Sequence, residues 1–382
     1  MRGFCGIDID GARAYVALAA YERGVVRFIE ELEIACNAGV DFIDTLKKNA
    51  YLIEQRIQEK EIAYSLKVEK VFCVLPWSVQ QRTQIDETVP FKSRKKVSAG
   101  DIGYARKYIQ ELALDWDDTC VHHLILDYEI EGQHFLRPPI GMQAKKINTR
   151  SLLFYIKEKL RREAEDVFDN LDREFGGFVS AGISSISVFN SQPHIVLPQI
   201  ILTIGARDMH VSVYRSGSLE FVSNDSFSVY HIFREIEKKF LLAPGLAGEI
   251  ADRYLSFTDT PHYKEISVKN GDTYASLSTQ TFNAFVCEFV RGKVREILAD
   301  IKRQREIMAC AVGCVSQLTT HEGFLEFFKT CAGEETLIPA NGRAASASFG
   351  CLSYGVHRFL ENDHCVTRSL MQKIMHVYSE YF

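Results

Sequence analysis

The sequence of 382 residues has no apolar run that approaches the roughly 20 residues of a transmembrane helix. Its first residues lead straight into a predicted strand, without the apolar segment of a secretory signal peptide. It also has no excess of basic charge, because the formal net charge is −5. We therefore expect no nucleic-acid partner, and we expect a cytoplasmic protein whose contact with a membrane is peripheral.

The 10 cysteines have no metal-binding pattern. No CxxC pair or His/Cys cluster shows zinc-finger spacing, and Cys310 and Cys314 lie four apart without partners. Scattered thiols are typical of free cysteines in a reducing compartment. His122 and His123 lie in a strand-like run without a nearby nucleophile or carboxylate pair, so we predict no catalytic residue and no metal site.

One pattern is present twice. Residues 4–28 contain three apolar runs, separated by turns at Asp10-Gly11 and Arg23-Gly24, and residues 200–222 repeat it with turns near Gly205 and at Ser216-Gly217. Hairpins with glycine turns can direct backbone N–H groups at an anion. Two such hairpins are what an actin-like nucleotide clamp needs, one from each half. The predicted class is therefore α/β: two ribonuclease-H-like lobes around a cleft.

Hydrophobic periodicity predicts the other elements. Arg94-Lys95-Lys96 is interpreted as a solvated basic turn, followed by a helix with Ser98 as its N-cap. Pro138-Pro139 predicts an extended corner. The remaining helices are predicted at 41–60, 151–175, 229–240, 245–255, 282–303, 322–330 and 344–359, and strands at 68–76, 122–132 and 307–318.

Six segments, taken in order, resemble those of FtsA, an actin-like family of bacterial cell-division proteins, over essentially the whole chain. They read GIDIDGARAYVAL, LDYEIEGQHFLRPPIGMQAKKI, TIGARDMHVSVYRSGSL, SVYHIFREI, IMACAVGCVSQL and FGCLSYG. The resemblance identifies them as the first phosphate loop, the FtsA-type insert, the second phosphate loop, the helix after it, the adenosine loop and the closing helix. No single motif is specific; the resemblance lies in their order and spacing.

The resemblance implies a division of the chain into lobes. The first lobe would comprise 1–87 and 161–196, with a small α+β subdomain inserted at 88–160 and packed on this lobe only. The second lobe would have its core at 197–227 and 302–348, with an outer subdomain at 228–301. A closing helix (349–360), a linker (361–366) and a membrane-targeting helix (367–382) would follow.

The resemblance also implies a nucleotide site, but its contacts are degraded. The hydroxyl groups of the family's first loop are missing here, where the sequence has Asp10 and Ala12. Thr203 stands where the family has a metal-associated Asp. Other family residues of the nucleotide site are replaced by Met209, Ser228, Val229, Ala251 and Val312. Either the surviving glycines only form turns, or two arginines contact phosphate instead. ATP is thus a doubtful cofactor, with Mg²⁺ only if ATP binds. The candidate nucleotide residues are Asp8, Gly11, Arg13, Gly205, Arg207 and Gly313.

The last 16 residues have one apolar face at helical spacing. That pattern is typical of a helix lying in the membrane interface, although a core-packed last helix would look the same. The polar face carries few cations, among them Arg368 and Lys373, so self-association would be needed for firm binding. The candidate membrane-binding residues are Leu370, Met371, Ile374, Met375, Tyr378, Tyr381 and Phe382.

From the resemblance we expect a non-catalytic adaptor with degenerate ATPase motifs. It would tether the tubulin-like protein FtsZ, through residues 228–301, to the cytoplasmic side of the inner membrane at the septum. It would self-associate into filaments and help recruit later division proteins. Two alternatives stay open: an actin-like filament former with slow ATPase activity, and a scaffold for pilus assembly like PilM.

Overall fold

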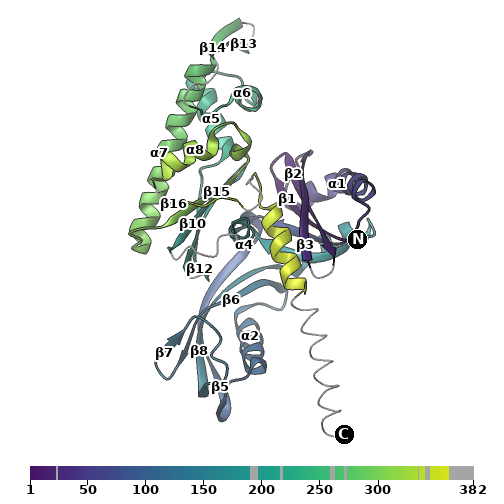
Figure 1. Cartoon of the computed structure of the whole chain (residues 1–382), viewed down its shortest axis with the longest axis vertical. Helices are drawn as coiled ribbons and strands as arrows, with labels where there is room; N and C mark the ends of the chain where they lie inside the picture. The colour runs from purple at the N-terminus through teal and green to yellow at the C-terminus, as the bar shows by residue number, and fades with distance from the viewer. Residues whose placement is uncertain are drawn as a thin grey trace. The chain divides into compact units, whose positions relative to one another are not determined.

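The structure is a computed structural model, and it describes residues 1–22, 25–189, 197–215, 218–258, 263–270, 273–333, 335–339 and 345–360 (Figure 1). The chain divides into two compact units. Unit 1 contains residues 1–187 and the segment from Ser348 onward, and unit 2 contains residues 188–347.

Unit 1 is built on a five-stranded sheet in the order β3-β2-β1-β4-β9. β1 pairs antiparallel with β2 and parallel with β4, and β4 pairs parallel with β9, which is therefore an edge strand. The predicted first hairpin is thus present. The strands are β1 (Arg2–Asp10), β2 (Arg13–Glu22), β3 (Val25–Ala35), β4 (Lys67–Leu75) and β9 (Glu174–Ser180).

Helices cover both faces of this sheet. On one face, Leu46 and Ile53 of α1 (Phe42–Tyr64) pack with Cys5 and Ile7 of β1 and with α3 (Glu158–Asp169). Asp41 begins α1 as its N-cap, since its side chain accepts the Asp44 N–H. Alternate residues of a strand point to opposite faces, so Gly6 faces the other side, against the closing helix at 348–360.

Between β4 and β9 the chain forms an inserted subdomain, a four-stranded antiparallel sheet in the order β5-β8-β6-β7. Its helix packs through Ala105 and Ile109 onto Val89 and Leu153. Ser98 and Asp101 form a capping box at the start of that helix, which confirms the predicted N-cap. The elements are β5 (Gln81–Lys96), α2 (Ala99–Ala113), β6 (Asp118–Ile130), β7 (Gln133–Phe135) and β8 (Gln143–Lys157), after a short 3-10 helix at Trp77–Val79.

Two expectations in this region were wrong. The long helix predicted at 151–175 is the second half of β8, then α3, then the start of β9. The apolar run at 151–156 is buried because β8 is a central strand between β5 and β6, an environment that periodicity cannot distinguish from a buried helix. The basic residues Arg94, Lys95 and Lys96 lie in strand β5, not in a turn.

Unit 2 repeats the sheet plan of unit 1, in the order β12-β11-β10-β15-β16. β10 pairs antiparallel with β11 and parallel with β15, as β1 does with β2 and β4. The second hairpin is therefore also present; its turn at Ser216-Gly217 lies outside the described residues. The strands are β10 (Gln199–Ile204), β11 (Met209–Arg215), β12 (Ser218–Asp225), β15 (Ala311–Ser316) and β16 (Glu335–Thr336).

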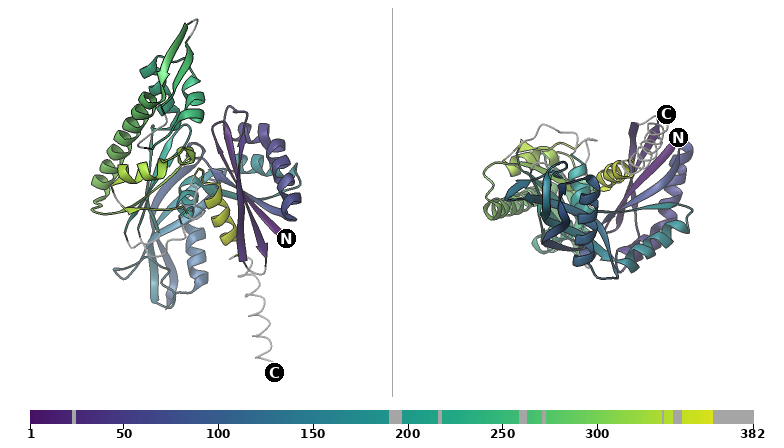
Figure 2. Two further views of the ribbon diagram at one scale, coloured as in Figure 1. Left: turned by 45° about the horizontal axis from the view of Figure 1, so that its top comes forward. Right: turned by 90° about the horizontal axis from the view of Figure 1, so that it is seen from below.

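The rest of unit 2 is mainly helical. The long helix α7 (Thr279–Arg305) is the green helix along one side of unit 2 (Figure 2). Its residues Val290 and Val294 belong to the core that contains Ile200 and Leu202 of β10. Its predicted position is confirmed, and those of α5 and α8 agree closely with prediction. The other elements are α5 (Val229–Phe240), α6 (Leu246–Tyr254), the hairpin β13 (Glu265–Asn270) and β14 (Thr273–Ser278), a 3-10 turn at Gln317–Thr320, and α8 (Phe324–Ala332); α4 (Ala181–Ser187) belongs to unit 1.

Candidate functional site

The first phosphate-loop candidate is a two-residue turn, Gly11-Ala12, between β1 and β2. Gly11 has a φ of +64°, a conformation that glycine adopts without strain. Arg13 follows the turn, but its guanidinium lies 2.5 Å from Glu33 of β3. The Ala12 carbonyl accepts the Cys36 N–H at 2.7 Å. Asp8, half-buried on β1, lies near the turn, so three candidates come together here.

The second loop, between β10 and β11, closes onto the start of α5. The carbonyls of Gly205 and Ala206 each accept an N–H from the first turn of α5, from Val229 and Tyr230, both at 3.0 Å. The next N–H of α5, on His231, is bonded to the Ser228 hydroxyl at 3.1 Å. The N–H groups that a helix N-terminus could donate to a phosphate are therefore already hydrogen-bonded within the protein.

Arg207 projects from this loop beside a hollow of about 670 Å³ in unit 2. Arg234 and His231 of α5 line the same hollow, with Ser226, Ser228 and Tyr230. These side chains suit an anionic group. None of the six is a carboxylate, so they offer Mg²⁺ no charged ligand. This hollow in unit 2 therefore suits an anion better than a nucleotide with bound metal.

Gly313, which the resemblance assigned to the adenosine loop, lies in a strand, in agreement with the strand predicted at 307–318. It pairs with Ile201 in the middle of the buried strand β15. A Cβ at this position would lie 2.9 Å from both Ile201 Cδ1 and Phe189 Cζ. Glycine is therefore required here because a larger residue would clash with the side chains of Ile201 and Phe189. The chain after β15 forms the 3-10 turn at Gln317–Thr320 instead.

We predict that Mg-ATP binds with a dissociation constant of about 100 µM or weaker and is not appreciably hydrolysed. The reason is that Arg13 is ion-paired and the first N–H groups of α5 are already bonded. Isothermal titration calorimetry is the test, with Arg207→Gln as the variant that should remove what binding remains. A sub-micromolar constant would contradict the prediction.

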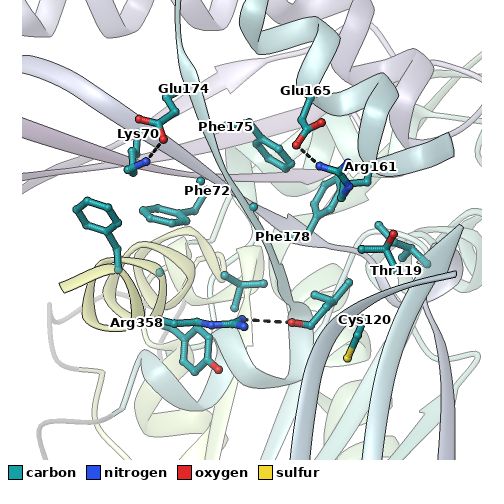
Figure 3. Close-up of a pocket in the computed structure, with 18 residues that line it drawn as sticks. Lys70, Phe72, Thr119, Cys120, Arg161, Glu165, Glu174, Phe175, Phe178 and Arg358 are labelled. Atoms are coloured by element: carbon teal, nitrogen blue, oxygen red, sulfur yellow. Dashed lines mark hydrogen bonds and ion pairs between the residues drawn. The ribbon is translucent and has the colours of Figure 1, made fainter. Parts of the chain in front are cut away.

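A groove of about 480 Å³ lies within unit 1, where the five-stranded sheet meets the insert (Figure 3). Six consecutive residues of the edge strand β9, from Glu174 to Val179, line it. β6 and α3 contribute Thr119, Cys120, Val121, Arg161 and Glu165, and the closing helix contributes Tyr354, Gly355, Arg358 and Phe359. The groove thus combines aromatic rings, paired charges and the edge of a sheet.

Four of the five charged groups that line the groove are held in ion pairs. Lys70 pairs with Glu174 and lies 4.7 Å from the ring of Phe359, and Arg161 pairs with Glu165. Arg358 donates to the Val121 carbonyl at 3.2 Å, which ties the closing helix to β6. No net charge dominates, so the groove suits a mixed apolar and polar segment.

Two glycines set the shape of the groove. The Phe72 ring of β4 lies between Gly176 of β9 and Gly355 of the closing helix, and a Cβ on either glycine would lie 2.5 Å from it. Gly177 has a φ of +113°, which restricts this position to glycine. The groove was not predicted from the sequence. The pair Gly176-Gly177 between Phe175 and Phe178 was the available signal, since glycine inside a strand marks a close backbone approach.

His122 of β6 joins the insert to the main sheet. Its Nε2 accepts the Ser180 N–H at 2.9 Å, and Tyr354 lies within 3.4 Å of its Nδ1. Burial, with a smaller contribution from the Arg358 charge, lowers the pKa of His122 to about 3. The ring is therefore neutral at physiological pH and has a structural role.

This environment predicts a loss of stability in mild acid. The pKa of His122 is about 3 when folded and 6.5 when exposed, so only the unfolded chain takes up a proton between these values. The free energy of unfolding should fall by up to about 1.4 kcal/mol per pH unit for this residue as pH falls below 6.5. Urea titrations between pH 7 and pH 5 give the free energy of unfolding at each pH. In His122→Gln this free energy should depend less steeply on pH than in the wild type. Equal slopes would contradict the prediction.

The predicted membrane-binding residues, from Leu370 to Phe382, lie outside the described residues. Among the helices that the structure describes, none is both long and apolar enough to cross a membrane.

Comparison with known proteins identifies the fold. No protein-family model and no curated protein matches the sequence. The structure is similar to PilM in a PilM–PilN type IV pilus biogenesis complex, with 12% identity, a TM-score of 0.59, and coverage of 92% of this chain and 96% of that one. It is also similar to diol dehydratase-reactivating factor, at 10% identity, TM-score 0.53 and 94% and 100% coverage.

A third similar structure is the ethanolamine utilization protein EutJ from Carboxydothermus hydrogenoformans, at 9% identity, TM-score 0.51 and 92% and 89% coverage. The chain therefore has the actin-like ATPase fold, as predicted. At these identities the likeness defines the fold and no more.

Proposed function

We propose that the protein is an adaptor rather than an enzyme: an FtsA-like protein that tethers FtsZ to the cytoplasmic face of the membrane at the septum. Through self-association it would assemble there and recruit later division proteins. The observation that carries the proposal is the state of the two phosphate loops. Arg13 is ion-paired with Glu33, and the carbonyls of Gly205 and Ala206 occupy the first N–H groups of α5.

The end of the sequence supports the membrane part of the proposal. Met371, Ile374 and Tyr378 recur at helical spacing in the sequence, so a helix over 367–382 would carry them along one side, and a helix with one apolar face binds the membrane interface. The closing helix, which leads into this segment, is fixed to the sheet at Gly6 and Phe72. Removal of the tail should therefore leave unit 1 folded.

Co-sedimentation with liposomes and FtsZ tests this proposal. Full-length protein should carry FtsZ down with uncharged phosphatidylcholine liposomes, and both Ile374→Asp and truncation before Thr367 should abolish this. Burial of each apolar side chain contributes about 1.5–3 kcal/mol, so one buried charge outweighs several such contributions. Circular dichroism controls for folding. If the truncated protein unfolds, the tail belongs to the core; if FtsZ stays in the supernatant, the FtsZ part fails.

A second candidate, a PilM-like scaffold, is favoured by the groove. β9 pairs only with β4 among the described strands, and residues 174–179 of β9 line the groove. An extended segment could add to such an edge as a further strand. PilM is a protein of similar fold that is known in complex with PilN. A pilus partner would here place an extended cytoplasmic segment along β9.

Amide hydrogen exchange distinguishes the two candidates. A cytoplasmic peptide of a pilus-assembly partner should slow exchange at Phe175 to Val179 if the scaffold is correct. Cys120→Trp, which fills the groove from β6, should remove this protection. FtsZ should instead protect residues within 228–301 and leave β9 unchanged. Protection of neither region would contradict both candidates.

A further inference from the structure

The inserted subdomain has a far end, where the label β5 stands in Figure 1. This end carries a strong excess of basic side chains. It is formed by the end of β5, the loop 136–142 and the start of β8, which are joined by antiparallel pairing of Lys95 with Ala144 and Lys96 with Gln143. We call it the basic tip. Its seven cations are Lys92, Arg94, Lys95, Lys96, Arg137, Lys145 and Lys146, all exposed.

Most of these cations have no counter-charge within the part of the chain that the structure describes. Arg94 pairs with Glu131 and Lys95 with Asp101. Among the residues that the structure describes, the other five make no ion pair, and neither 91–97 nor 136–147 contains an acid. A cluster of this size attracts a multivalent anion or an anionic surface.

The loop between β7 and β8 adds apolar groups to the same tip. Leu136 and Ile140 are each 58% exposed. The loop is nevertheless held in place: Pro139 is buried, the Gly141 N–H donates to the Val97 carbonyl at 2.8 Å, and the Val97 N–H donates to Met142 at 2.8 Å. Two aliphatic side chains are thus presented to solvent on a well-anchored corner, surrounded by cations.

We propose that the basic tip is a second membrane contact, which binds the headgroups of anionic lipids while Leu136 and Ile140 enter the interface. An acidic protein partner would also be attracted, but exposed aliphatic side chains on a projecting corner suit a flat, partly apolar surface. Membrane anchors of modest strength commonly need two signals, an apolar segment and a polybasic patch. This inference deepens the membrane attachment in the proposed function.

The test is co-sedimentation of the full chain with phosphatidylcholine vesicles, with and without phosphatidylserine. Each cation near an anionic surface strengthens binding about fivefold, so Lys96→Gln/Lys145→Gln/Lys146→Gln should weaken binding on the order of 100-fold. The loss should appear only with phosphatidylserine and shrink as salt rises. Leu136→Ser/Ile140→Ser should weaken binding to both kinds of vesicle.

A matched variant controls for net charge. Lys159→Gln/Lys239→Gln/Lys329→Gln removes the same charge from exposed positions on α3, α5 and α8. It should bind vesicles like the wild type. Equal weakening by the two triple variants, or none by the tip variant, would overturn the proposal. Binding of polyglutamate by the tip without any contribution to vesicle binding would overturn it in favour of an acidic partner.

The Ile374→Asp variant separates this inference from the tail. With phosphatidylserine it should retain weak, salt-sensitive binding, which the tip triple should remove. If Ile374→Asp alone abolishes all binding and the tip triple changes nothing, the tail anchor stands and the inference fails. If Ile374→Asp binds normally while the tip triple does not bind, the inference stands and the tail anchor fails.

Discussion

Arg173→Met is expected to lower the free energy of unfolding of unit 1 by about 3–5 kcal/mol, because it leaves the buried Glu54 and the partly buried Glu61 without their counter-charge. Arg173, just before β9, is 8% exposed and reaches into α1. Its guanidinium bonds both oxygens of Glu54 and of Glu61, at 2.6–3.2 Å, and the Val68 carbonyl at 3.0 Å. These bonds raise the pKa of Arg173 despite its burial, so it stays charged.

Tryptophan fluorescence can follow this unfolding selectively. The chain has two tryptophans, Trp77 and Trp116, and both lie in unit 1. Urea titration of Arg173→Met should show the loss at neutral pH. Arg56→Met is the matched control, because Arg56 pairs with Glu59 on the exposed side of α1 and such pairs contribute about 0–1 kcal/mol. Similar effects of both substitutions would show that the bonds of Arg173 with Glu54 and Glu61 do not hold α1 to β9.

Gly6→Ala is expected to destabilise unit 1 by about 1–3 kcal/mol or more, although it adds a single methyl group. The new Cβ would lie 2.4 Å from the Ser348 carbonyl oxygen and 2.8 Å from Leu352 Cβ. Backbone cannot rotate away as a side chain can, so the closing helix must move. That helix forms a wall of the groove through Tyr354 and Arg358, so the groove should open as stability falls.

The same urea titration measures this effect. Substitution of a second glycine by alanine should instead raise the free energy of unfolding. Gly103 lies within α2 with nothing within 4 Å of its added Cβ. Gly103→Ala should stabilise the protein by about 0.5–1 kcal/mol, because alanine favours the helix. A neutral Gly6→Ala would mean that the closing helix is not held tightly against β1.

The fold was predictable where the signal is local. Ser98 precedes apolar periodicity and caps α2 as predicted, and Asp41, the first residue of the helix predicted at 41–60, caps α1. The two hairpins were recognisable because apolar runs and glycine turns depend on neighbouring residues. Residues 151–156 were misassigned because an apolar run is buried equally well in a helix or in a central strand, and only the partners β5 and β6 decide between them.

The sequence by itself determined the actin-like class and marked the basic residues at 94–96, the tail pattern and the degraded phosphate loops. Only the tertiary structure decided which groups these residues contact. It paired Arg13 with Glu33, packed Gly313 against Ile201 and Phe189, and left most of the basic tip without a counter-charge among the described residues. The groove was beyond sequence because Phe72, Arg161, Gly176 and Arg358 are distant in the chain, and their contacts arise only when long-range strand pairing and helix packing bring them together.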